Sequence, residues 1–148
     1  MKRIFIASLI IFSLSATSLF AQQNEEVRQV IASMFEGMKS KNTDLIKADF
    51  HPDATMQTVK SGENGSELGS NSVVTRIASS PATTILDERI LDYQIKVDGD
   101  MAAAWTPYEF YVNDNFSHCG VNSFQLIKTT EGWKITYIID TRRKEGCK

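Results

Sequence analysis

The sequence has no excess of basic residues and few cysteines or histidines, and each shortage excludes a class of protein. Lys and Arg total 16 against 18 for Asp and Glu, so no surplus positive charge is available to neutralise a nucleic-acid backbone. Two cysteines are too few for a scaffold built from disulfides. Two histidines supply too few imidazole ligands for a metal site, so we expect no metal. The chain has 148 residues, of which 42% are hydrophobic, and this length and composition are typical of one globular domain.

The first 21 residues have the order of a secretory signal peptide. Lys2 and Arg3 precede an apolar run over 4–14, and small residues follow it up to Ala21. The run is shorter than the roughly 20 residues that span a bilayer, so we expect cleavage after Ala21 and no membrane span in the mature chain. We therefore expect a periplasmic or secreted protein with a single domain over 22–148.

The two cysteines leave two alternatives open. In an oxidising compartment, Cys119 and Cys147 are able to form a disulfide. Because Cys147 is the penultimate residue, such a bond would hold the C-terminal tail against the domain. The alternative is a pair of free thiols.

The first half of the mature chain has helical periodicity. An apolar stripe at helical spacing predicts a helix that ends near Lys41; it comprises Val27, Val30, Ile31, Met34, Phe35 and Met38. Asn42 or Thr43 can cap a second, short helix, which Pro52 ends. A third helix is expected over 70–79. The polar stretch over 61–71 contains glycines without the Lys-Ser/Thr pair of a phosphate-binding loop, so we expect a surface loop there and no cofactor.

The second half of the chain is typical of an antiparallel sheet. A short strand is expected over 54–60, and turn residues such as Asp98-Gly99 separate four longer ones. The four predicted strands are Arg89–Asp98, Met101–Val112, Phe116–Lys128 and Trp133–Arg142. Helices followed by such strands indicate an α+β domain.

Turn positions fix which side chains share a face of the sheet. With Asp114-Asn115 at the tip of the central hairpin, Tyr111 lies opposite His118 and Glu109 lies two residues along the strand. The same register predicts one face with Trp105, Phe124 and Tyr137, with Asn122 and His118 toward its end. Asp140 and Arg142 lie on the opposite face, where we interpret them as a solvated or interfacial ion pair. A bulge at Pro107 would exchange the faces on one side of it.

Three segments carry a resemblance to a known superfamily. They are DFHPDATM over 49–56, the hairpin over 105–128, and EGWKITYIIDTRR over 131–143. The chain resembles the nuclear transport factor 2-like superfamily, which has the SnoaL-like cone fold. Within it, the chain is most similar to small secreted bacterial proteins of the putative lumazine-binding type. The resemblance implies three N-terminal helices packed on a strongly curved, mostly antiparallel sheet.

Three functions are compatible with these features. The first is non-catalytic binding of a small apolar or flat heterocyclic molecule by Trp105, Asn122, Phe124 and Tyr137. The second is an isomerase or dehydratase, with His118 as general base, Tyr111 as electrophilic partner and Glu109 as the carboxylate beside them. The third is a ligand-free interaction domain. Because both faces of the predicted sheet are half apolar, a second copy of the chain is expected to cover the face that the helices leave open, which predicts a homodimer.

Overall fold

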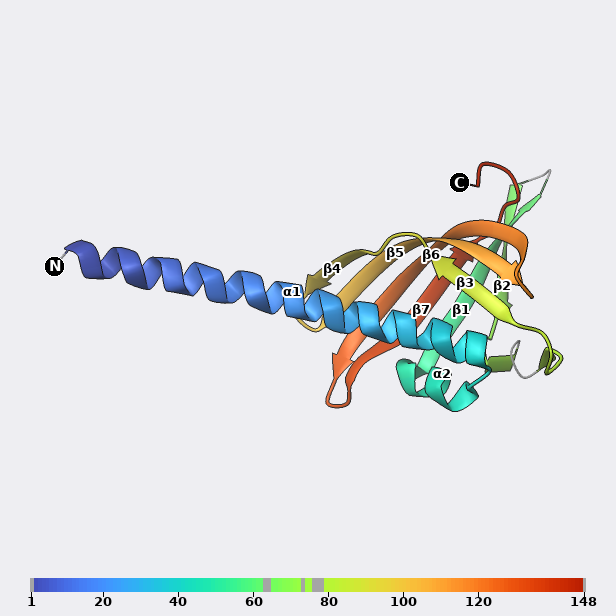
Figure 1. Cartoon of the computed structure of the whole chain (residues 1–148), viewed down its shortest axis with the longest axis horizontal. Helices are drawn as coiled ribbons and strands as arrows, with labels where there is room; N and C mark the ends of the chain where they lie inside the picture. The colour runs from blue at the N-terminus through green and yellow to red at the C-terminus, as the bar shows by residue number, and fades with distance from the viewer. Residues whose placement is uncertain (1, 63–64, 73, 76–78, 148) are drawn as a thin grey trace.

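Two helices precede the sheet. The structure is a computed structural model that describes residues 2–62, 65–72, 74–75 and 79–147. Helix α1 (Lys2–Ser40) is continuous, and helix α2 (Thr43–Asp49) follows it closely. The C-terminal half of α1 lies along a curved sheet, whereas its N-terminal half, which contains the predicted signal peptide, projects beyond the sheet (Figure 1). Within the described ranges, no helix is long and apolar enough to cross a membrane.

The junction between the helices follows from three residues. Lys41 ends α1 in the left-handed conformation, with a φ of 60°. Asn42 then caps α2, because its side chain accepts a hydrogen bond from the Leu45 backbone N–H at 3.0 Å. Gly37 allows the helices to approach, since a Cβ atom there would lie 2.7 Å from Ile46 Cγ1.

The prediction of three helices is corrected to two in the described part of the chain. Ser70 and Asn71, the first residues of the expected third helix, are extended, whereas Val74, Thr75 and Ser79 are helical. Residues 73 and 76–78 of that segment lie outside the described residues. Phe50, expected inside the second helix, already begins the first strand, and Pro52 lies within that strand.

Seven strands form one sheet. Their order is β2-β1-β7-β6-β5-β3, and β4 also pairs with β5. Only the β1–β7 pair is parallel, so the sheet of the described residues is mostly antiparallel, as predicted. The strands are β1 (Phe50–Gly62), β2 (Gly65–Asn71), β3 (Leu86–Ile90), β4 (Gln94–Asp98), β5 (Met101–Val112), β6 (Asn115–Thr129) and β7 (Gly132–Thr141).

Two strand predictions were wrong. The stretch over 61–71 is not a loop: it contains β2, an exposed edge strand whose backbone pairs with β1 despite its polar and glycine-rich composition. The strand expected over 89–98 is two strands, because Pro107 of β5 lies between the residues that pair with β3 and those that pair with β4. Proline has no N–H to continue the ladder, and Leu91 instead donates its N–H to the Pro107 carbonyl at 2.9 Å.

The turn of the central hairpin lies one residue earlier than predicted, which changes the pairing next to the turn by two residues. The turn is Asn113-Asp114, both with positive φ, so Val112 pairs with Asn115. A bulge at Ser117 then brings His118 opposite Phe110. A second bulge lies at Thr136 of β7, because Gln125 pairs with Tyr137 whereas Leu126 pairs with Ile135. The bulges therefore lie away from Pro107, where one was expected.

The sheet has an inner face toward α1 and an outer face away from it. The predicted apolar stripe of α1 is confirmed, since Val27, Ile31 and Met34 are buried. Phe35 packs edge-on against Phe124 of β6, with ring centroids 6.1 Å apart. The other fully buried core side chains come from α2 and the long strands; they include Ile46, Tyr108, Leu126, Ile135 and Ile138.

Candidate functional site

A small pocket, here called the inner pocket, lies between α1 and the inner face of the sheet. Its cavity is about 20 Å³, enough for one water molecule. Its apolar walls come from α1 and four strands and comprise Met34, Phe35, Met38, Met56, Phe110, Phe124 and Ile138. Its polar side is formed by Glu88, Tyr108, His118, Asn122, Asp140 and Arg142. A mostly apolar cavity with a few convergent polar groups is typical of a small-molecule site.

Asp140 is the most unusual polar group of the inner pocket. It is 4% exposed, and its Oδ2 accepts a hydrogen bond from Arg142 Nε at 2.8 Å. Its Oδ1 is buried and has no hydrogen-bond partner among the described residues. The pair was predicted as a solvated or interfacial ion pair, whereas the structure buries Asp140 in the wall of a cavity. The two residues lie together, as predicted, but on the face of Asn122 and Phe124 and not on the opposite face, because Asp140 is the cross-strand partner of Asn122.

Asn122 and Glu88 form a second polar contact in the wall. Asn122 Nδ2 donates to Glu88 Oε1 at 2.7 Å and lies 3.4 Å from Thr106 Oγ1. Asn122 and Thr106 are buried, and β6 and β5 hold them as direct cross-strand partners. The Asn122 amide is therefore fixed in orientation at the edge of the cavity.

His118 lies on the inner face among aromatic rings. Its ring centroid is 4.8 Å from that of Phe110 and 5.8 Å from that of Tyr108. Ser117 Oγ lies 3.1 Å from His118 Nδ1. His118 and Asp140 therefore line the same cavity.

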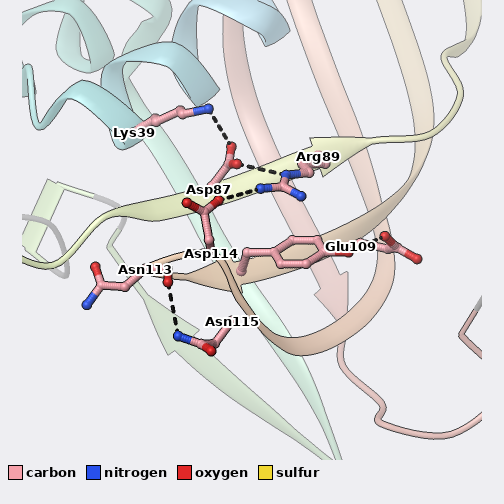
Figure 2. A network of polar contacts seen from close by, with 8 residues as sticks. Lys39, Asp87, Arg89, Glu109, Asn113, Asp114 and Asn115 are labelled. Carbon is pink, nitrogen blue, oxygen red and sulfur yellow. Dashed lines mark hydrogen bonds and ion pairs between the residues drawn. The ribbon is translucent and has the colours of Figure 1, made fainter.

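The predicted trio of His118, Tyr111 and Glu109 is not brought together. The earlier turn places Tyr111 opposite Phe116, and the bulge at Ser117 turns His118 inward while Tyr111 and Glu109 stay on the outer face. There the Tyr111 hydroxyl donates to Glu109 Oε2 at 2.8 Å, and the Arg89 guanidinium lies 3.9 Å from the centroid of the Tyr111 ring. Arg89 is the cross-strand partner of Glu109, and Figure 2 shows its guanidinium joined to Asp87 and Asp114.

The four predicted ligand-binding residues divide between the two faces. Phe124 and Asn122 line the inner pocket. Trp105 lies on the outer face and is half exposed. Tyr137 pairs with Gln125 on that face and donates its hydroxyl to Gln57 Oε1 at 2.6 Å. The sequence analysis did not assign Glu88 and Asp140 to the pocket. For Asp140 a signal was available, because it lies on the same face of its strand as Ile138.

An open groove, here called the tail groove, adjoins the inner pocket. Its volume is about 520 Å³. Phe110, His118 and Arg142 line both spaces, and the C-terminal tail adds Arg143 and Lys144 to the groove. The tail is held by a disulfide between Cys119 and Cys147 and by two backbone hydrogen bonds of 2.9 Å between Cys119 and Arg143.

Comparison with known proteins assigns the family. The sequence profile described as putative lumazine-binding matches residues 22–137. The chain belongs to this family. The fold of this family member is that of the nuclear transport factor 2-like superfamily. No curated protein matches the chain.

Solved structures similar to this family member share its fold. A nuclear transport factor 2-like protein with a cystatin-like fold from Novosphingobium aromaticivorans has a TM-score of 0.70 at 17% identity, over 90% of each chain. A protein from Streptomyces avermitilis, described as a putative dehydratase, has a TM-score of 0.66 at 16% identity, over 83% of this chain and 97% of its own. A superfamily protein from Salmonella enterica has a TM-score of 0.65 at 18% identity, over 86% and 95%.

Proposed function

We propose that the protein binds a small, flat heterocyclic molecule in the inner pocket. The unpartnered Oδ1 of Asp140 carries this proposal. A buried acceptor without a hydrogen bond destabilises a protein by about 1–3 kcal/mol, and by more when it is charged. A ligand that donates a ring N–H to this oxygen would remove that penalty. The family description and the aromatic walls support a heterocycle.

The walls of the inner pocket explain how it admits a ligand. A cavity of about 20 Å³ is far smaller than a bicyclic ring, so side chains must move on binding. Met34, Met38 and Met56 line it, and methionine side chains change shape easily because they are long and unbranched. A ring would then insert beside Phe124 and Phe110, with its donor edge toward Asp140.

A titration with lumazine tests this proposal. Lumazine is flat and has ring N–H donors, and its fluorescence reports binding. We expect Asp140→Asn to weaken binding by about tenfold, because a hydrogen bond to a charged acceptor is stronger than one to a neutral acceptor. Asp98→Asn, in an exposed residue at the end of β4, should leave the affinity unchanged. Absence of lumazine binding, together with no small molecule retained in native mass spectra of protein purified from its host, would overturn the proposal.

A second candidate is acid–base catalysis of the isomerase or dehydratase type. His118 and Asp140 line one cavity, which supports the general-base role predicted for His118. Tyr111 cannot assist from the outer face. The test is to incubate an extract of host metabolites with the protein and follow each compound by mass spectrometry. Conversion by the protein but not by His118→Gln would support this candidate, and equal conversion by both would exclude the role of His118.

Export and dimerisation complete the proposal. The disulfide supports an oxidising periplasmic or extracellular location, since disulfides are rare in reducing compartments. A signal peptide cleaved after Ala21 would direct the chain there. The outer face exposes Met101, Trp105, Phe116 and Ile127, which supports a homodimer through that face. The mass of the mature chain and its native oligomer test both statements.

A further inference from the structure

We propose that the ligand carries an anionic group, a carboxylate or a phosphate, which binds in the tail groove at Arg143 and Lys144. This inference rests on ligand binding in the inner pocket and adds the charge and the orientation of the ligand. The tail groove adjoins the inner pocket, because Phe110, His118 and Arg142 line both. A molecule that moves these side chains aside would extend from Asp140 to the tail.

The tail groove contains positive charge that the protein does not itself neutralise. Arg142 is paired with Asp140. Arg143 and Lys144 are exposed, and in the described part of the chain their side chains form no ion pair and no hydrogen bond. An arginine beside a lysine supplies several N–H donors to an oxyanion, and hydrogen bonds between charged groups are the strong ones.

The backbone that carries these cations is fixed in place. Arg143 exchanges two backbone hydrogen bonds with Cys119, and the Cys119–Cys147 disulfide closes the segment beyond it. The chain from 143 to 147 is thus held at both ends. Ordering a flexible basic tail around a ligand would cost conformational entropy, and much of that cost is already met in the folded protein.

Charge of opposite sign at the two ends of the site fixes the orientation of the ligand. Asp140 and Glu88 line the inner pocket, so an anionic group placed there would be repelled. Arg143 and Lys144 lie at the open end. A ligand with an N–H donor on its ring and an anionic substituent therefore enters ring first and leaves its charge in the tail groove.

Two matched probes test the inference: lumazine, and lumazine-6-carboxylate, which adds only the anionic group. In the intact protein we expect the carboxylate to bind about tenfold more tightly than lumazine. The double variant Arg143→Gln/Lys144→Gln should lose this advantage and bind lumazine as before. A double variant that removes two exposed charges elsewhere, Lys60→Gln/Lys96→Gln, should retain the advantage.

Competition identifies the anion. Inorganic phosphate and acetate are added separately to the bound carboxylate probe, and preferential displacement by either one assigns that chemistry to the groove. Displacement by neither anion would overturn the inference, as would equal affinity of both probes in the intact protein, while lumazine binding itself would stand. If neither probe binds, the inference and the proposed ligand class both fail.

Discussion

Gly120 lies so close to Thr141 that a Cβ atom on Gly120 would be 1.9 Å from the Thr141 carbonyl oxygen. The Tyr108 hydroxyl donates a hydrogen bond to that oxygen at 2.9 Å, and Tyr108 is the cross-strand partner of Gly120. The end of β7 is therefore held against β6 at a point where only a glycine fits. Asp140, the residue before Thr141, lines the inner pocket beside this contact.

We expect Gly120→Ala to lower the free energy of unfolding by about 2–3 kcal/mol, because the neighbouring atom is backbone and cannot rotate away. Denaturant unfolding of the oxidised protein measures the change. Gly69→Ala is the matched control. Its Cβ would meet chiefly the flexible end of Lys60 on an exposed strand, so its effect should stay within about 0.5 kcal/mol. Equal stability of both variants would contradict the close approach.

The disulfide is expected to stabilise the folded protein. Cys119 and Cys147 are 28 residues apart in sequence, and a crosslink over such a loop contributes roughly 3–4 kcal/mol by restricting the unfolded chain. The variant Cys119→Ala/Cys147→Ser should lose about that amount in denaturant unfolding. A reducing agent should lower the stability of the parent protein and leave the variant unchanged. The variant has no cysteines. If the reducing agent also lowered its stability, the loss of stability in the parent protein would have an origin other than the disulfide.

The largely buried carboxylate of Asp87 joins α1 to the sheet (Figure 2). Its carboxylate is 3.2 Å from Lys39 Nζ and accepts a hydrogen bond from Arg89 Nε at 2.8 Å. Burial alone would raise the pKa of Asp87, but the hydrogen bonds from Arg89 and Lys39 outweigh it and lower this pKa below its ordinary value. Because the folded-state pKa is lowered, the contribution to stability is present at neutral pH and is lost as the pH falls through that pKa.

We therefore expect Asp87→Asn to destabilise the protein at neutral pH by about 1–2 kcal/mol. The difference from the parent protein should shrink as the pH is lowered below about 4. Unfolding curves at several pH values measure both effects. Asp114→Asn changes an exposed partner of Arg89 and should have a small effect at every pH. A difference independent of pH would argue against the ion pairs as its cause.

The order of elements and the core were predictable from the sequence because periodicity reports burial directly. The spacing of Val27, Ile31 and Met34 gave the inner side of α1, and β5 was predicted with its observed bounds. The strand β2 was not predictable in this way, since its Gly and Ser residues have low strand propensity and its pairing with β1 comes from the backbone. Pro107 marked a real irregularity, and its effect falls on the neighbouring strands β3 and β4.

The candidate site was less predictable because it depends on bulges. Side chains alternate along a strand, so one extra residue at Ser117 exchanges the faces of everything paired beyond it. That single shift separated His118 from Tyr111 and Glu109. It also moved Trp105 to the outer face while Phe124 stayed inside. Composition around Ser117 contains no signal that distinguishes a bulge from a regular pair.

The bulge at Ser117 predicts different contributions to stability from Trp105 and Phe124, which the sequence analysis placed on one face. Phe124 is fully buried and packs against Phe35, whereas Trp105 is half exposed. We expect Phe124→Ala to lower the free energy of unfolding by about 3–5 kcal/mol. Trp105→Ala should change the stability of the monomer by less than about 1 kcal/mol, because its ring already contacts water. Denaturant unfolding at low protein concentration compares the two variants. If Trp105→Ala were as damaging as Phe124→Ala, the two rings would share one face, which is the register of the hairpin without the bulge.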